Sequence, residues 1–267
     1  MHFGATLRLL RVDAGFTLRE LADRIGVSNA YLSRVENGHD APPTPDRLVA
    51  LARAFGLGPT SLVELADRVT PIAADYFDDV PAARDLMLDV VRRKLGPMQI
   101  ARVRAFIERE FPDRQGDHLA REAAALFDPA RVVVGLSGTE LEDVVDVAAT
   151  RLAAEDRRLS VRALSHAVLE RERSCPTALG SGLAIPHAVL PGVKPAAVVV
   201  TLRRPLAIDT PDGSPLRMVI VHIHPGAGGH TRILAQLARL AEKERIEEVA
   251  ALRSPQAIVR SLIAALG

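Results

Sequence analysis

Hydrophobic positions in the first 68 residues recur at the spacing of short amphipathic helices, with apolar residues three and four apart. Glycines interrupt this pattern, as expected where one short helix gives way to the next. Four helices are predicted to end near Gly15, Gly26, Gly38 and Gly56, and a fifth to open at Ser61. Residues 1–68 are therefore expected to form an all-helical domain of five short helices.

The remaining 199 residues change pattern twice. Residues 69–120 contain two stretches with the apolar spacing of helices, DLMLDVVRRKL and MQIARVRAFIEREF. They predict a helical hairpin that connects the two domains, either as a spacer or as a dimer contact. The stretch 112–117, PDRQGD, is the expected flexible joint. From 121 to 267, apolar runs at 131–136, 196–202 and 217–223 predict strands that alternate with helices. The third region is therefore an α/β sandwich with a mostly parallel or mixed sheet flanked by helices.

Composition narrows the setting of the protein. The formal net charge is +1, so no bulk field draws the chain onto nucleic acid or membrane. A single cysteine, Cys175, excludes a disulfide framework within one chain. The N-terminus lacks the apolar core of a signal peptide, and no run of about 18 apolar residues predicts a membrane span. A cytoplasmic protein without membrane insertion is expected.

Two helices joined by a short glycine turn, with further helices on both sides, form a helix-turn-helix arrangement. The run TLRELADRIGVSNAYLSRVENG, residues 17–38, resembles the Cro/repressor-type (xenobiotic-response-element) DNA-binding domain over residues 4–67. The resemblance implies a double-stranded DNA operator as partner, a homodimer, and an internal ion pair between Arg11 and Glu36. It places the following residues at bases or phosphates: Thr17, Leu18, Ser28, Asn29, Ala30, Ser33, Arg34 and Asn37.

The chemistry of these positions agrees in part with base recognition. Arginine bonds bidentately to guanine and asparagine to adenine, which suits Arg34 and Asn29. Leu18 stands where a polar residue is often found, so its phosphate contact is expected to use the backbone alone. Residues 1–70 hold eight basic and eight acidic residues, so the domain has no net charge. The alternative is a helix-turn-helix that contacts only protein.

A second motif, GSGLAIPH, ends in His187. Together with the upstream Leu-Glu-Arg-Glu run ending at 172 and with His230 heading a helix, it resembles the enzyme IIA component, mannitol/fructose/nitrogen type, of the bacterial phosphotransferase system. The resemblance covers residues 121–267. It implies that His187 accepts a phosphoryl group, that His230 steadies it, and that Arg171 supplies a cation. Backbone N–H groups of the loop are expected to contribute as well, from Gly180, Ser181 and Gly182.

Several features depart from that family. Ser181 replaces a usual asparagine, and residues 173–177 replace the common loop, so the site could be an unphosphorylated remnant. His222 and His224 share one face of a strand that is usually apolar. A metal site of His187, His224 and His230 is conceivable, but no carboxylate is evident beside them, so no metal and no other cofactor is expected. His222 and His224 are expected to be hydrogen-bonded strand histidines.

Three functions remain open. The first is a transcriptional regulator whose enzyme-IIA-like domain senses the phosphotransferase system through phosphorylation of His187 by the histidine carrier protein. The second is a phosphocarrier that relays phosphate from that carrier to a sugar-transporter subunit, which would make the chain a phosphotransferase with a phosphohistidine intermediate. The third is a scaffold that binds a partner protein stoichiometrically. The sequence leaves open whether the chain is an enzyme and favours a regulator.

Overall fold

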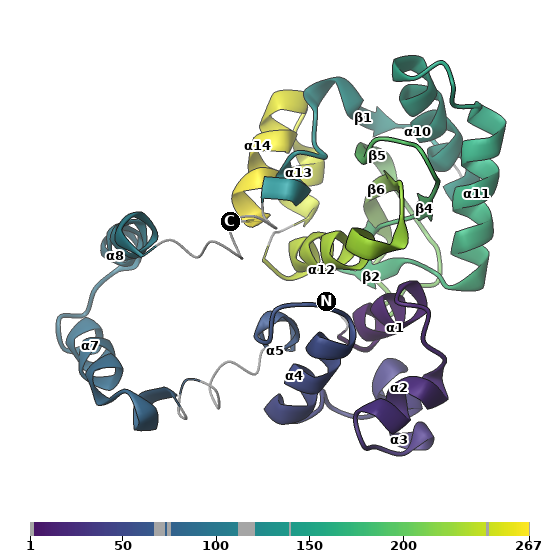
Figure 1. Ribbon diagram of the computed structural model, residues 1–267. Helices are drawn as coiled ribbons and strands as arrows, with labels where there is room; N and C mark the ends of the chain where they lie inside the picture. Colours follow the sequence, from purple (N-terminus) through teal and green to yellow (C-terminus); the bar gives the residue numbers. More distant parts are fainter. Residues whose placement is uncertain are drawn as a thin grey trace.

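The computed structural model describes residues 3–66, 73, 76–111, 121–138, 140–243 and 246–266. A helical head, a helical hairpin and an α/β domain follow one another along the chain (Figure 1). This arrangement confirms the predicted fold class, including the mixed sheet flanked by helices. The expected joint at 112–117 lies outside the described residues.

The head forms its helices where the capping residues predict. Thr17 Oγ1 accepts from the backbone N–H of Glu20 at 3.2 Å, and Glu20 Oε2 accepts from the N–H of Thr17 at 2.8 Å, a complete capping box. Ser28 Oγ accepts from the N–H of Tyr31 at 3.1 Å and caps the next helix. The helices are α1 (Phe3–Asp13), α2 (Leu18–Arg24), α3 (Asn29–Glu36), α4 (Pro45–Ala54) and α5 (Ser61–Leu65).

Helix α1 crosses the end of α3 at very close range. A Cβ at Gly4 would lie 2.2 Å from the backbone oxygen of Val35, so only glycine fits there. Beside this crossing the predicted ion pair is confirmed, because Arg11 Nε donates to Glu36 Oε1 at 2.6 Å and Nη2 to Oε2 at 2.8 Å. The pair and the crossing fix α1 to the rest of the head.

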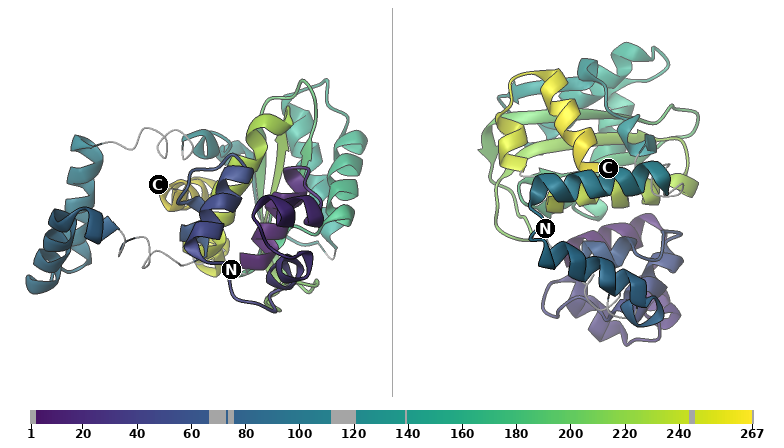
Figure 2. Two further views of the ribbon diagram at one scale, coloured as in Figure 1. Left: turned by 60° about the horizontal axis from the view of Figure 1, so that its bottom comes forward. Right: turned by 90° about the vertical axis from the view of Figure 1, so that its left-hand side faces the viewer.

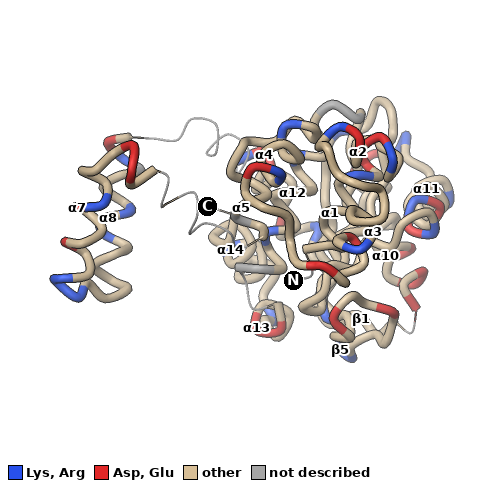
Figure 3. Tube along the Cα trace, turned by 90° about the horizontal axis from the view of Figure 1, so that it is seen from below, with Lys and Arg blue, Asp and Glu red and all other residues tan. Residues whose placement is uncertain are grey.

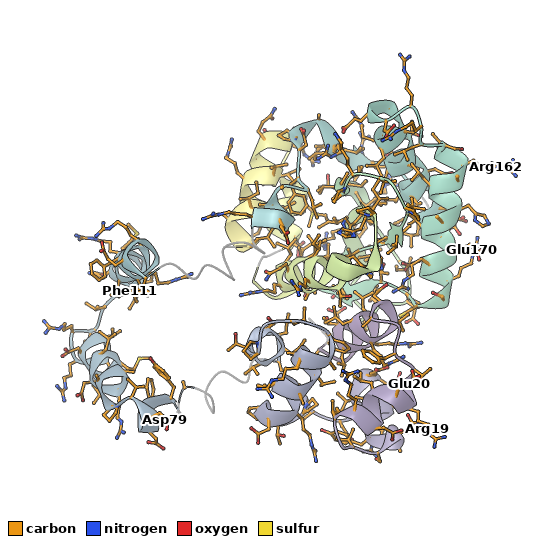
Figure 4. The ribbon with its side chains drawn as sticks, in the orientation of Figure 1. Arg19, Glu20, Asp79, Phe111, Arg162 and Glu170 are labelled. Carbon is orange, nitrogen blue, oxygen red and sulfur yellow. The ribbon has the colours of Figure 1, made fainter. Side chains whose placement is uncertain are left out.

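The connector forms the expected hairpin of α7 (Pro81–Arg92) and α8 (Pro97–Glu110), which stands apart from both domains (Figure 2). No residue of α7 is buried. Figure 4 shows Phe111 at the end of α8 with its ring in the open. Large apolar side chains exposed on the hairpin are Leu86, Met87, Leu88, Val91, Met98, Phe106, Ile107 and Phe111.

The α/β domain is built on a six-stranded mixed sheet in the order β1-β5-β6-β3-β2, with β4 also paired to β6. Strand β1 runs parallel to β5, β5 antiparallel to β6, and β3 and β4 parallel to β6. A short 3-10 turn (Pro129–Arg131) precedes the first strand. The strands are β1 (Val132–Leu136), β2 (Ala178–Gly180), β3 (Leu183–Ala184), β4 (His187–Val189), β5 (Ala196–Leu206) and β6 (Leu216–His224).

Helices cover both faces of the sheet, and alternate residues of each strand face opposite cores. Val219 and Val221 pack with α10 (Leu141–Glu155) and α11 (Val161–Ser174). Met218 and Ile220 face the other side, which is covered by α12 (Ala227–Lys243), α13 (Ile246–Ala251) and α14 (Pro255–Leu266).

The head packs against α12. The hydrophobic core between the sheet and α12, α13 and α14 is therefore continuous with the core of the head. Helices α1 and α5 contact α12, and α1 also contacts β2 (Figure 1). Arg232 on α12 donates through Nε to the backbone oxygen of Gly56 at 2.9 Å. Acidic and basic residues are interspersed over the surface of the head (Figure 3). Among the described helices, none is both long and apolar enough to cross a membrane.

Candidate functional site

His187 begins β4, directly after Pro186, and its backbone pairs with that of His222 on β6. The side chain is 1% exposed. Its Nδ1 lies 2.9 Å from the backbone oxygen of Ile185. A carbonyl oxygen only accepts, so Nδ1 carries the proton of this bond. In the neutral ring, Nε2 is therefore the nitrogen with a free electron pair.

His230 and Arg171 reach the same site as His187 from two helices. His230 lies in the first turn of α12 and is 2% exposed, with its ring centroid 6.0 Å from that of His187. Arg171 lies in the last turn of α11 and is oriented by a 3.0 Å bond from Nη1 to the backbone oxygen of Cys175. The structure thus brings together the three residues that the sequence singled out for phosphoryl chemistry.

The head contributes a fourth residue, Asp13, the last residue of α1. Its Oδ1 lies 2.9 Å from Nε2 of His187 and 3.4 Å from Nε2 of His230. Arg171 binds the carboxylate in a bidentate ion pair, in which Nε donates to Oδ1 at 3.1 Å and Nη2 donates to Oδ2 at 2.6 Å. A carboxylate of the head therefore lies at the centre of the histidine site.

Electrostatics keep this carboxylate ionised. Burial alone would raise the pKa of the Asp13 carboxyl, but hydrogen bonds from His187, His230 and Arg171 together hold that pKa well below its usual value. An acidic residue at the C-terminal end of a helix is opposed by the helix dipole. The ionised Asp13 is therefore disfavoured by its own helix and stabilised by the cations of the α/β domain.

The contacts of His187 engage both of its ring nitrogens. Nδ1 donates to a carbonyl oxygen, and Nε2 lies at hydrogen-bond distance from a carboxylate oxygen of Asp13. While Asp13 is in place, Nε2 is therefore occupied by this contact.

Asp13 was missed by the sequence analysis and overturns one of its arguments. No carboxylate was expected beside the histidines, whereas Asp13, His187 and His230 offer three potential metal ligands within 4.8 Å of one another. The second oxygen of Asp13 is engaged by Arg171, so its charge is already compensated. A divalent cation would add positive charge directly beside that guanidinium, and the arrangement fits an anion site better.

The glycine loop does not join this site, contrary to the expectation for Gly180, Ser181 and Gly182. These residues form the turn between β2 and β3, and the N–H of Ser181 donates to Asp212 Oδ2 at 2.7 Å. Leu183 and His187 keep the same register against β6, so four extended residues, or roughly 13 Å, separate them. The turn lies farther along still. A Cβ at Gly180 would meet Asp212 at 2.8 Å, so the glycine serves the turn.

The two additional strand histidines differ from each other. His224 bonds through Nδ1 to the backbone oxygen of Gly226 at 2.6 Å, as expected for a strand histidine. His222 is 1% exposed, and neither of its ring nitrogens has a hydrogen-bond partner among the described residues, so the same expectation is wrong for it. Burial, followed by the nearby histidines, lowers the pKa of His222 well below its ordinary value.

Beside the site, Glu172 accepts from both the N–H and the hydroxyl of Thr177, at 2.9 and 2.6 Å. Burial raises the pKa of the Glu172 carboxyl despite these bonds. The pair ties the end of α11 to β2 and so helps to position Arg171, one residue away.

The residues assigned to DNA recognition lie on α2, on α3 and at their caps. Arg34 forms a bidentate ion pair with Asp40, 2.7 Å from Nη2 to Oδ1. The amide of Asn37 donates to the backbone oxygen of Ser33 at 2.8 Å. The remaining members of the predicted set are exposed or half-buried, namely Thr17, Leu18, Ser28, Asn29 and Ala30. In Figure 4, Arg19 and Glu20 on neighbouring α2 point away from the α/β domain.

One end of α3 approaches the α/β domain. Asn37 and Glu36 line a groove together with Asp209 and Pro211 of the loop that follows β5. A phosphate held at Asn37 would lie in a groove that also holds the carboxylate of Asp209. The position of the head on the α/β domain therefore bears on one of the expected DNA contacts.

A helical head joined to an α/β domain whose sheet and flanking helices bring two histidines and an arginine together defines a helix-turn-helix protein with an enzyme-IIA-type domain. Residues 125–265 match the family model "Phosphoenolpyruvate-dependent sugar phosphotransferase system, EIIA 2", and residues 2–65 match a helix-turn-helix domain model. The first match covers more than half of the chain, and the protein belongs to that EIIA 2 family.

The chain is also similar to individual proteins. A nitrogen regulatory protein of Bradyrhizobium diazoefficiens is 38% identical over 110 residues, 40% of this chain and 72% of that protein. A propionyl-CoA carboxylase regulator of Cereibacter sphaeroides is 36% identical over 94 residues, 33% of this chain and 20% of its own length. The crystal structure of nitrogen regulatory protein IIA-Ntr from Neisseria meningitidis is 25% identical with a TM-score of 0.48, covering 52% of this chain and 97% of that one.

Proposed function

We propose that the protein is a DNA-binding transcriptional regulator whose EIIA domain is phosphorylated on His187 by the histidine carrier protein of the phosphotransferase system. The observation that carries the proposal is the orientation of His187. Its Nδ1 donates to the oxygen of Ile185, which leaves Nε2 as the nucleophile of the neutral ring. The ring of His230 lies beside it, and Arg171 binds the same Asp13 carboxylate that Nε2 contacts. The chain that carries this histidine also carries a helix-turn-helix head.

Phosphoryl transfer needs an in-line nucleophile and compensation of charge, and little else from the protein. Nε2 would attack the phosphorus of the carrier's phosphohistidine. The new N–P bond forms as the old one breaks, and the electron pair of the broken bond stays on the carrier's imidazole. Arg171 and the N–H of His230 would then stabilise the phosphoryl oxygens, aided by the N-terminal end of α12.

Mass spectrometry tests the acceptor. The full chain, incubated with phosphoenolpyruvate and the general phosphotransferase proteins, is expected to gain one acid-labile phosphoryl group on His187. His187→Ala should abolish the modification. His166→Ala, which removes an exposed histidine on the outer face of α11, should leave it unchanged. Absence of phosphohistidine on His187 in the unaltered chain would refute the proposed acceptor.

DNA binding tests the regulatory half. We expect the phosphorylated and unphosphorylated chains to differ in operator affinity, because adding about two negative charges beside the head changes how the head packs on the α/β domain. The operator is first selected from random duplexes. The same affinity in both states would leave a DNA-binding protein but contradict phosphorylation as its signal.

A second function is favoured by one relative, the 2-O-alpha-mannosyl-D-glycerate-specific EIIABC component of Escherichia coli, 34% identical over 131 residues. These cover 46% of this chain and 20% of that protein. The chain would then pass the phosphoryl group from His187 to a transporter subunit. Transfer of labelled phosphate from the phosphorylated chain to an EIIB domain would support the phosphocarrier function, and retention of the label would exclude it.

The proposed homodimer is supported by the hairpin. Helix α7 has no buried residue, and the apolar side chains of α7 and α8 find no partner elsewhere among the described residues that would cover them. An exposed apolar surface of this kind marks an interaction site. A second copy is the partner that two-fold symmetric operator recognition requires.

A further inference from the structure

We propose that Asp13 is an intramolecular latch: its carboxylate occupies the phosphoryl position of His187, so that the docked head and phosphorylated His187 exclude each other. This inference rests on the proposed phosphorylation of His187. It adds the residue through which the state of the histidine is transmitted to the DNA-binding head.

Occupancy is the first step of the argument. Asp13 Oδ1 lies 2.9 Å from Nε2, which is hydrogen-bond distance, whereas a phosphorus atom bound to Nε2 would be much closer. The phosphoryl group would therefore fill the volume of the Asp13 carboxylate. Its oxygens would also need Arg171, whose guanidinium is already engaged by both oxygens of Asp13. Steric overlap and competition for one cation act in the same direction.

The hydrogen bonds of His187 are the second step and act in the same direction. With Asp13 in place, Nδ1 is engaged by the oxygen of Ile185 and Nε2 by Oδ1 of Asp13. A nucleophile needs Nε2 directed at the phosphorus atom, and in the docked state Nε2 is directed at the carboxylate. The head must therefore move Asp13 away before His187 can react.

Access is the third step. His187 and His230 are 1% and 2% exposed, because α1 lies over them. A phosphodonor cannot approach Nε2 in line through the helix that carries Asp13. Accordingly, only a form with the head displaced reacts, and phosphorylation traps that form, because a phosphoryl group of charge near −2 repels the returning carboxylate.

Linkage gives the expected size of the effect. If phosphorylation weakens docking by a given factor, docking weakens phosphorylation by the same factor at equilibrium. Coupling between sites commonly amounts to about 5–150-fold. Asp13→Asn keeps the size of the side chain but removes the charge that holds it at Arg171, so it should release much of this coupling.

The experiment uses the full chain and phosphoramidate, a small donor whose P–N bond breaks as the Nε2–P bond forms and ammonia leaves. EDTA is present throughout, so that no metal occupies the site. Phosphohistidine on His187 is followed by intact-mass spectrometry in the unaltered protein, in Asp13→Asn and in Asp23→Asn. Asp23 is a matched control, since its side chain is on α2 of the same head and 74% exposed.

We expect Asp13→Asn to be phosphorylated at least fivefold faster than the unaltered protein, and Asp23→Asn at the unaltered rate. Equal rates for all three would overturn the latch while leaving His187 as the acceptor. No phosphohistidine in any of them would refute the proposed function itself, and the latch with it.

A second measurement needs no variant and so does not depend on how Asp13→Asn folds. Hydrogen exchange of the unaltered protein is compared before and after phosphorylation. Loss of protection in α1 and in the facing α12, with α10 unchanged, is expected when the head leaves. Unchanged protection of α1 in fully phosphorylated protein would show that head and phosphoryl group coexist, and would overturn the proposal.

Discussion

The head is joined to the α/β domain in two ways, and the two joints differ in nearly every physical respect. The covalent joint is the connector, whose hairpin carries exposed apolar side chains and has no buried residue in α7. The non-covalent joint is the contact of α1 with α12, with its buried core and an ion pair between Asp13 and Arg171. The comparison indicates that contacts set the position of the head, and the phosphorylation proposed for His187 would act on those contacts.

The largest effect is expected from breaking the ion pair at the non-covalent joint. Arg171→Met leaves the carboxylate of Asp13 buried without its bidentate cation, and removing one partner of a buried pair costs about 3–5 kcal/mol. The free energy of unfolding by urea should fall by this amount. Arg173→Met is the control, because Arg173 lies on the same helix, is 62% exposed and pairs with exposed Glu170, so its loss should cost no more than about 1 kcal/mol.

The same measurement distinguishes a role of Arg171 in docking the head from a role in stabilising the α/β domain. A loss confined to the transition of the head would show that Arg171 serves docking. Destabilisation of the α/β domain with the head still in place would instead make Arg171 a structural residue of α11, and would weaken the comparison between the two joints.

The next prediction concerns the covalent joint. Replacing Leu86, Val91 and Phe106 by serine removes three exposed apolar side chains from the hairpin. If the hairpin is the dimer contact, each loses about 1.5 kcal/mol or more of burial, and self-association measured by analytical ultracentrifugation should weaken by over a hundredfold. Docking of the head, followed by hydrogen exchange in α1, should not change. A dimer that survives the triple replacement would place the contact elsewhere.

Much of this architecture could be predicted from the sequence because the signals are local. The capping pair of Thr17 with Glu20 and the serine before α3 specify helix starts, and apolar periodicity specifies the strands. The ion pair of Arg11 with Glu36 and the convergence of His187, His230 and Arg171 came from family resemblance, and the contacts agree with both.

Asp13 could not be predicted, because its partners lie 158 and 174 residues further along the chain. Nothing in the sequence RVDAG marks that contact. The one local signal is an acidic residue where the helix dipole disfavours it, and this is too weak to specify a partner. The glycine loop was misplaced for a related reason. The motif that contains Gly180 and His187 is contiguous in sequence, but an extended strand carries its two ends far apart.

A smaller effect is expected from a substitution on α3, the helix expected to contact the bases. It tests base recognition by the head separately from the two joints. Arg34→Ala removes the side chain expected to contact a guanine and should weaken specific operator binding by about 1–3 kcal/mol while relaxing specificity at one base pair. Fluorescence anisotropy on specific and mutated duplexes measures both. The control is Arg19→Ala on α2, with its side chain 85% exposed, which should leave the base preference unchanged. An unchanged base preference in Arg34→Ala would contradict the assignment of α3 as the reading helix.

The smallest expected effect concerns His222, whose backbone pairs with that of His187 and whose ring has no hydrogen-bond partner in the described part of the chain. Its pKa in the folded protein is lowered below the ordinary value of 6.5, chiefly by burial, so the unfolded chain binds a proton more readily than the folded one. Burial of the neutral His222 ring therefore leaves the free energy of unfolding undiminished above about pH 6.5, and this free energy falls as the pH drops below that value. His222→Leu should reduce the difference in unfolding free energy between pH 7.5 and pH 5.5 by about 1 kcal/mol, since one pKa unit corresponds to about 1.4 kcal/mol. Urea titrations at the two pH values measure it, with His166→Leu as the exposed counterpart. An undiminished pH dependence in His222→Leu would contradict the buried ring of His222 as the source of this effect.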